Sequence, residues 1–166
     1  MKLEGKAHKF GDDVNTGHII SGRFRAHTAD IAELAEHTLE DLDPEFSRRV
    51  VKGDLIVAGR NFGCGSSREQ APRVIKHLGI GAILACSFAR IFYRNAVALG
   101  IPIIECETEQ IHAGDHLRID LERGEVEDLT QNSTFRINPM PSFMWNIIQD
   151  GGLLAHIKKH GTFQMD

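Results

Sequence analysis

The 166-residue chain lacks the features that mark membrane proteins, secreted proteins and most nucleic-acid-binding proteins. No window approaches the roughly 18 consecutive apolar residues that a membrane span requires, and the start, MKLEGK, has no apolar signal-peptide core. Positive charge is not concentrated, because nineteen basic residues are spread along a chain with a net charge of −4. We therefore expect a cytoplasmic protein that binds neither a membrane nor nucleic acid.

Cysteine is also scarce. Cys64, Cys86 and Cys106 lie about twenty residues apart and form no C-x-x-C pair. This spacing favours neither a disulfide framework nor a local zinc site. We assign no metal ligand to the chain, its nine histidines included, and expect any metal to come from elsewhere.

Linkers of low complexity are missing as well, so residues 1–166 are predicted to form a single domain. Apolar runs over 54–59, 81–86 and 102–106 indicate buried strands, with helical spacing over 71–78 and 87–99 between them. Alternating runs over 116–121 and 134–137 are typical of antiparallel strands. The chain is therefore predicted to be an α/β protein with a mixed sheet. We also expect loops over 11–26, a helix over 30–39 and two helical pieces after residue 142.

The glycine-dense segment that ends in Ser66, Ser67 and Arg68 is the best candidate for a binding site. Its glycines let the backbone approach a ligand closely, and the serines stand where the next helix is expected to begin. Arg68 in a first helical turn would be unfavourable unless an anion were bound, and its planar fork suits a carboxylate. Phosphate is the competing candidate ligand for this segment. The structural alternative is that the serines merely form capping boxes with Glu69 and Gln70.

Nucleotide binding is disfavoured, because the segment matches neither a Walker loop nor the last glycine of the dinucleotide fingerprint. Cys64 has no identifiable partner base, so we interpret it as a loop-packing residue.

Two blocks, Gly65-Ser66-Ser67-Arg68-Glu69 and Ser87-Phe88-Ala89-Arg90-Ile91, resemble the swivelling domain of aconitase and the small subunits of isopropylmalate isomerase and homoaconitase. The resemblance extends over nearly the whole chain, from Lys9–Val14 to Gly151–Leu153. It implies a three-layer β/β/α swivelling domain like the aconitase C-terminal domain. It also implies a hydro-lyase that isomerises a hydroxy di- or tricarboxylic acid by dehydration and rehydration. Ser66 would then be the catalytic base, and Ser67 and Arg68 would hold a substrate carboxylate.

The same resemblance implies a [4Fe-4S] cluster as the Lewis acid. Three dispersed cysteines lack the family's cluster-binding pattern. The cluster is therefore expected on a separate large subunit, in a heterodimer or heterotetramer, and the small subunit alone should be inactive.

The substrate would be chosen by the loop over 21–27. Phe24-Arg25-Ala26 is similar to the aconitase loop whose arginine binds the distal carboxylate, so Arg25 is the expected ligand and Arg23 the second candidate. We favour homoaconitase, acting on homocitrate, homoaconitate and homoisocitrate in lysine biosynthesis, over 3-isopropylmalate dehydratase in leucine biosynthesis. Dual specificity stays open. A non-catalytic carboxylate-binding or nucleic-acid-binding module is the alternative of another class.

The chain departs from the family pattern at Gly17, where an acidic residue is expected. His18, Asp12 or Asp13 could replace that acid, or the hydrogen-bond network could be altered.

Overall fold

The structure, a computed structural model, describes residues 2–161. The strands are β1 (Lys2–Lys9), β2 (Leu55–Ala58), β3 (Ala82–Ala85), β4 (Ile103–Glu105), β5 (His116–Asp120), β6 (Glu125–Asp128) and β7 (Ser133–Arg136). The helices are α1 (Thr16–Ile19), α2 (Gly22–Arg25), α3 (Ile31–Ala35), α4 (Phe46–Arg49), α5 (Gln70–His77), α6 (Arg90–Ala98), α7 (Ser142–Gln149) and α8 (Leu153–His160). Within this part of the chain, no helix is long and apolar enough to cross a membrane.

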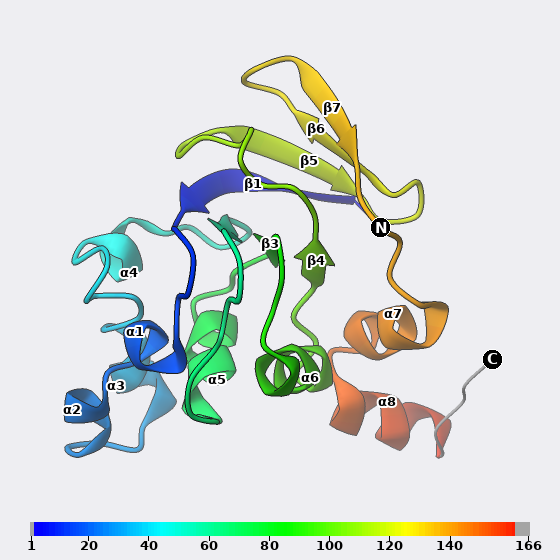
Figure 1. The fold of residues 1–166 in the computed structure, drawn as a ribbon. Coiled ribbons are helices and arrows are strands. Elements are labelled where there is room, and N and C mark those ends of the chain that lie inside the picture. The colour runs from blue at the N-terminus through cyan, green and yellow to red at the C-terminus, as the bar shows by residue number, and fades with distance from the viewer. Residues whose placement is uncertain (1, 162–166) are drawn as a thin grey trace.

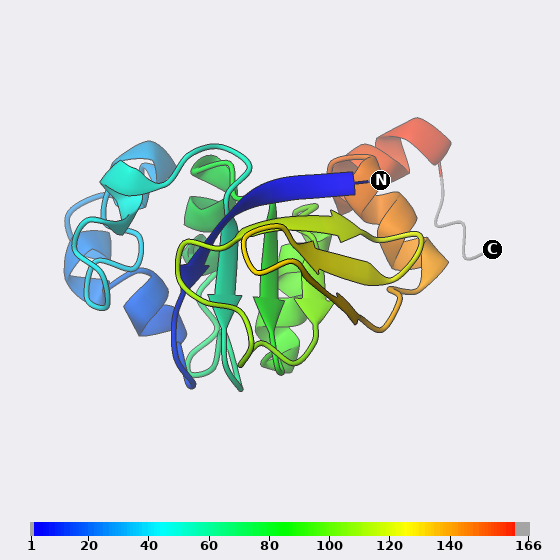
Figure 2. The ribbon, with the colours of Figure 1, turned by 90° about the horizontal axis from the view of Figure 1, so that it is seen from above.

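The strands form one mixed sheet in the order β4-β3-β2-β1-β5-β6-β7. Strands β1 to β4 pair in parallel, with Ala7 opposite Leu55, whereas β5 pairs antiparallel with β1 and begins the β5-β6-β7 meander. Strand β1 belongs to both halves, and the sheet curls so that the antiparallel strands lie across the parallel ones, with α5 and α6 on the other side (Figures 1 and 2).

Two apolar cores account for this layering. The strands β2 and β3 are buried along their whole length, as expected where both faces of a parallel sheet are covered. Alternate residues such as Ile56 and Ile83 pack with the helices, whereas Leu55 and Leu84 pack with Leu117 and other residues of the antiparallel strands. The predicted mixed α/β fold with a β/β/α arrangement is therefore confirmed.

Several local predictions were wrong. The helix expected over 30–39 is helical only at Ile31–Ala35, and the segment expected to be loop over 11–26 contains the short helices α1 and α2. Strands β1 and β6 and helix α4 were not predicted. Both strands are rich in polar residues, and they form because neighbouring strands supply their hydrogen-bond partners.

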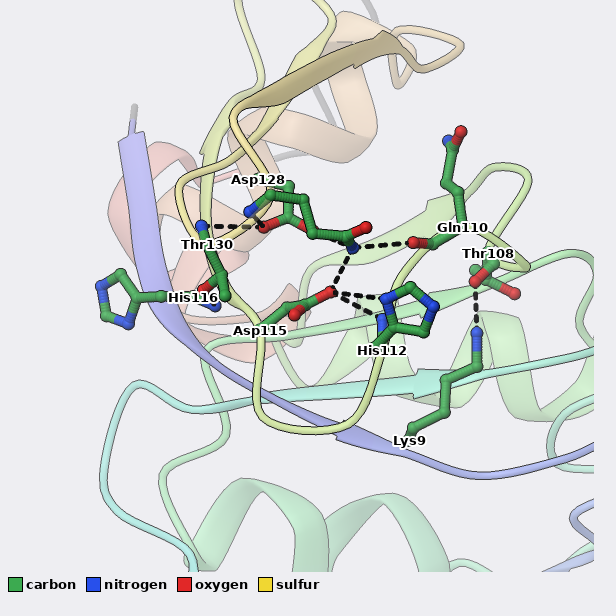
Figure 3. Close-up of polar contacts among 9 residues, drawn as sticks. Lys9, Thr108, Gln110, His112, Asp115, His116, Asp128 and Thr130 are labelled. Atoms are coloured by element: carbon green, nitrogen blue, oxygen red, sulfur yellow. Dashed lines mark hydrogen bonds and ion pairs between the residues drawn. The ribbon is translucent and has the colours of Figure 1, made fainter.

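A partly buried polar network fastens the antiparallel half to the loop before β5 (Figure 3). The side-chain amide of Gln131 donates to Gln110 O at 2.9 Å, to Asp115 Oδ2 at 2.6 Å and to Asp128 Oδ2 at 2.9 Å. Burial raises the pKa of the Asp115 carboxyl, but contacts with His112 N–H, Asp128 and Gln131 outweigh it and hold that pKa below its ordinary value. This network stabilises the fold.

Candidate active site

The candidate site forms where the loops after β1, β2 and β3 meet, at the carboxyl end of the parallel strands. The loop after β2 lies between the other two: Gly63 N–H donates to Val14 O at 2.7 Å, and Phe62 N–H donates to Ser87 O at 3.0 Å. Ala89 N–H returns a bond to Phe62 O at 2.9 Å. The two sequence blocks that carry the resemblance are thus brought side by side by the sheet.

Glycine is required in this loop for two reasons. Gly63 has φ +79°, and a Cβ atom there would lie 2.2 Å from Phe92 Cγ, so the backbone rests directly on that ring. Gly65 has φ +88°, but a Cβ there would meet nothing closer than Asn15 Cβ at 3.5 Å. Both glycines permit a left-handed backbone, and Gly63 also permits close packing.

A pocket of about 350 Å³ opens beside these glycines, a size suited to a small ligand. It lies between the loop after β2 and the first turns of α6. Its lining residues are Thr16, Gly63, Gly65, Ser66, Ser67, Arg68, Ala89, Arg90, Ile91, Phe92 and Asn95.

Ser66 and Arg68 are in direct contact. Arg68 Nε donates to Ser66 Oγ at 3.2 Å, and Arg68 Nη1 donates to Ile20 O at 2.8 Å. Thr16 Oγ1 donates to Ser66 O at 2.6 Å, which fixes the backbone of the serine. The side chains of Ser66 and Ser67 are exposed in this chain. The structure therefore brings together three of the five predicted site residues in one pocket.

The expected helix start was placed too early. Helix α5 begins at Gln70, and its N-cap, Glu69, makes no side-chain capping bond. Ser66 and Ser67 thus precede the helix and form no capping box, and Arg68 does not lie in the first turn. The predicted placement of Arg68 at the positive end of the α5 dipole was therefore wrong. The contact between Arg68 and Ser66 does not depend on that dipole.

Arg90 and Asn95 were not predicted as site residues, although both line the pocket. Arg90 is exposed at the first position of the nine-residue helix α6, whose N-cap residue Ala89 offers no side-chain cap. Two arginines, Arg68 and Arg90, therefore line the pocket together with the first turn of α6, which favours an anionic ligand. A signal for Arg90 exists in the sequence, because the residue lies within the second resemblance block.

The predicted specificity residues lie on α2, outside this pocket. Arg23 Nη2 forms an ion pair with Asp41 Oδ1 at 2.8 Å, and its guanidinium lies 4.7 Å from the centroid of the Phe24 ring. That ring stacks on His37 at 3.7 Å, so α2 is held against the segment after α3. Arg25 is exposed, and no polar partner is recorded for it within residues 2–161. The bond from Arg68 to Ile20 O connects the turn before α2 to the pocket.

A side chain at Gly17 would face Arg68. A Cβ atom there would lie 3.4 Å from Arg68 Nη1 and 3.6 Å from Nη2, so the missing acid would have been a neighbour of the guanidinium. The three residues suggested as replacements for that acid form hydrogen bonds within the loops instead. His18 Nδ1 accepts from Asn15 N–H at 3.3 Å, and the carboxylates of Asp12 and Asp13 accept from Arg60 N–H and the Asn61 amide.

The three cysteines do not converge on one another as a set of iron ligands within residues 2–161. Burial raises the pKa of the Cys64 thiol and raises that of Cys106 to about 12, so both are thiols in the chain on its own. Within residues 2–161, the one group of three or more metal-ligating side chains that converges contains no cysteine.

Comparison with known proteins gives consistent similarities. Residues 9–109 match the model of the aconitase C-terminal domain. The chain is 53% identical over 160 residues to the 3-isopropylmalate dehydratase small subunit of Caldicellulosiruptor saccharolyticus, covering 95% of this chain and 92% of that protein. It is 50% identical over 157 residues to the methanogen homoaconitase small subunit of Methanothermobacter thermautotrophicus, covering 95% and 91%. The crystal structure of a 3-isopropylmalate dehydratase from Methanocaldococcus jannaschii superimposes with a TM-score of 0.92 at 46% identity, covering 97% of this chain and 96% of that one.

Proposed function

This chain belongs to the aconitase family as the small subunit of a hydro-lyase, and from that premise we propose that the pocket beside Ser66 acts on a hydroxy di- or tricarboxylic acid. The family resemblance inferred from the two sequence blocks is thereby confirmed. The reaction that we propose removes water from the substrate and adds it back at the neighbouring carbon.

Ser66 is the proposed catalytic base. The observation that carries this role is the bond from Arg68 Nε to Ser66 Oγ, at 3.2 Å, inside a pocket that holds a second arginine. A serine hydroxyl is a poor base, so its alkoxide must be stabilised, and a charged donor aimed at the oxygen does this. The alkoxide would take the proton from the carbon next to a carboxylate and hold it as the Ser66 hydroxyl until rehydration.

Ser67 and Arg68 are proposed to hold that carboxylate. Arg68 Nη1 is committed to Ile20 O and Nε to Ser66 Oγ, which leaves Nη2 with no recorded bond in the described chain. The exposed Ser67 hydroxyl is a second donor on the same loop. Arg90 and the first turn of α6 line the same pocket and add positive charge.

Aconitase-family enzymes use an iron-sulfur cluster, generally on the large subunit. We propose that a large-subunit partner carries the [4Fe-4S] cluster for this chain, in a heterodimer or heterotetramer, and that activity requires both chains. The names of the relatives as small subunits support such a partner. The absence of a converging set of cysteines within residues 2–161 supports its location on that partner.

The substrate that we propose is a homoaconitate-type acid with a second carboxylate, bound by Arg25. Arg25 is exposed and without a recorded partner in residues 2–161, whereas Arg23 is committed to Asp41. This ranks Arg25 above Arg23 as a ligand for a substrate arm. The second candidate is 3-isopropylmalate, which the names of several relatives favour.

Reconstitution with the large subunit tests the base. Loss of turnover in Ser66→Ala with little change in KM would support the role, whereas Ser67→Ala should mainly raise KM because it removes a donor to bound carboxylate. The formation of the unsaturated acid is followed by absorbance. Full activity of the Ser66→Ala complex would exclude Ser66 as the base.

The substrate is tested with the pair Arg25→Leu and Arg23→Leu. A substrate carboxylate that loses its charged partner in the assembled complex costs about 1–3 kcal/mol, or roughly 5- to 150-fold in kcat/KM. We expect this loss for homoaconitate in Arg25→Leu, a smaller loss in Arg23→Leu and no loss for 3-isopropylmalate. Wild-type turnover of 3-isopropylmalate alone would reject homoaconitate, and equal losses for both substrates would reject Arg25.

A further inference from the structure

The corner between α7 and α8 holds a convergent group of metal-ligating side chains. Asp150 follows α7, and His156 and His160 lie one turn apart on α8. Asp150 Oδ2 lies 2.7 Å from His156 Nδ1 and 2.9 Å from His160 Nε2. The three ligand atoms all lie within 4.8 Å of one another. The two histidines have H-x-x-x-H spacing in the sequence, so the expectation that no histidine of the chain is a metal ligand missed this pair.

The corner is held rigidly by the rest of the fold. Gly152 has φ +119°, and a Cβ atom there would lie 2.6 Å from Ala98 O, so the start of α8 rests on the end of α6. Lys76 Nζ also donates to Gly151 O at 3.1 Å and to Leu99 O. Because the backbone on both sides of the group is fixed, little ordering would be needed to bind a ligand.

We propose that Asp150, His156 and His160 form a binding site for a divalent transition metal of the zinc class. Two imidazole nitrogens and one carboxylate oxygen are a ligand set that such ions take, with water in the fourth position. The side chains of Asp150 and His156 are 8% and 3% exposed, while that of His160 is 31% exposed and leaves an entry path.

The observed distances are those of a hydrogen-bonded group and need a small adjustment. Metal-to-ligand distances of about 2.0–2.1 Å in a tetrahedral site place ligand atoms about 3.3 Å apart. The separations of 2.7 and 2.9 Å must therefore widen by about half an ångström. Rotation of the partly exposed His160 ring widens its separation from Asp150, whereas the separation of Asp150 and His156 requires a small adjustment of two buried side chains.

Lys159 both orients the Asp150 carboxylate and adds a positive charge beside the proposed site. Its Nζ lies 2.6 Å from Asp150 Oδ1, the oxygen that does not face the histidines. The bond orients the carboxylate as an outer partner of the metal does, but the ammonium charge opposes a cation nearby. We expect removal of this charge to tighten metal binding.

Titration of the full chain with Co²⁺ tests the proposal, because tetrahedral Co²⁺ bound by nitrogen and oxygen absorbs in the visible range and Zn²⁺ should displace it. His160→Ala is the diagnostic variant, since its side chain is partly exposed and its loss should leave the fold intact. The matched control is His77→Ala, an exposed histidine at the last position of α5. We expect affinity to fall at least about tenfold in His160→Ala, to stay unchanged in His77→Ala, and to rise in Lys159→Ala.

A thermal shift measured on the same proteins provides the second readout. Zn²⁺ should raise the Tm of the wild type and of His77→Ala, but not that of His160→Ala. Absence of the Co²⁺ band at millimolar metal would overturn the proposal, as would equal affinities in the two histidine variants. Neither readout involves Ser66 or the large subunit, so the result is independent of the proposed reaction.

Discussion

Gly63 couples the packing of the candidate site to its chemistry, and its replacement by alanine gives a sharp test. The residue has φ +79°, and an added Cβ would lie 2.2 Å from Phe92 Cγ and 2.4 Å from Phe92 Cβ. The Phe92 ring is buried and packs edge-on against Phe62, with 5.2 Å between ring centroids, so it has little freedom to move. The loop that carries Ser66 must shift instead.

The nearby Gly65 separates the cost of the left-handed backbone from the cost of overpacking. Gly65→Ala incurs only the left-handed backbone cost of about 1–2 kcal/mol, because its nearest neighbour, Asn15 Cβ, would lie at an ordinary 3.5 Å. Gly63→Ala adds an overpacking cost of about 1–3 kcal/mol, for a total of roughly 2–5 kcal/mol. Urea denaturation of both variants measures the difference in the free energy of unfolding.

Activity of the reconstituted complex gives the functional half of the test. A displacement of about 1 Å in a catalytic group can cost roughly a hundredfold in rate. We therefore expect folded Gly63→Ala to lose turnover even at temperatures where it remains native. Equal destabilisation of the two variants would refute the packing argument, and unchanged turnover in Gly63→Ala would refute the link to Ser66.

Three further predictions concern the scaffold. Burial raises the pKa of the Asp54 carboxyl, but hydrogen bonds from His8 and two backbone amides hold it below its ordinary value. Its contribution to stability is therefore present above about pH 4 and is lost as pH falls through the folded pKa. In Asp54→Asn, the free energy of unfolding measured in urea should therefore change less between pH 7 and pH 3 than in the wild type. An equal change in both proteins would contradict this. Cys106, with a pKa raised to about 12 by burial, should resist iodoacetamide until the chain unfolds, as mass spectrometry can check. Gly100→Ala would place a Cβ 2.7 Å from Gly151 C at φ +81°, so we expect about 2–5 kcal/mol of destabilisation by urea titration, and a loss below about 0.5 kcal/mol would count against the close approach.

The parallel half of the sheet was predictable because its strands are buried on both faces. Uniformly apolar runs such as Leu55–Ala58 and Ala82–Ala85 indicate buried parallel strands when a glycine bounds them and a helical pattern follows. Strand β1 was not predictable in the same way. Its sequence, KLEGKAHK, is mostly polar, and it becomes the central strand because β2 and β5 pair with its two edges. Tertiary pairing overrides local preference there.

The candidate site shows a similar division. Ser66, Ser67 and Arg68 were identified from one continuous segment and its family resemblance. Arg90 joins them because the sheet places the loop after β3 beside the loop after β2, a neighbourhood that no local pattern encodes. The helix start was misplaced because Ser-x-x-Glu is compatible with both a helix cap and a binding loop, and spacing alone does not separate the two.

The exposure of Ser66 and Ser67 gives a physical reason to expect a partner surface. In water, an alkoxide at Ser66 and a carboxylate at Arg68 would both be solvated and screened, so the stabilisation that each gains from Arg68 would be weak. Covering the pocket would lower the local dielectric and strengthen the bond from Arg68 to Ser66 Oγ without moving either residue. On the proposed function, association with the large subunit therefore does more than supply a cluster, because it also stabilises the alkoxide form of Ser66. If so, the pH dependence of kcat in the complex should change in Arg68→Lys, which keeps the charge and loses the Nε donor, and an unaltered profile would argue that Arg68 serves only to bind substrate.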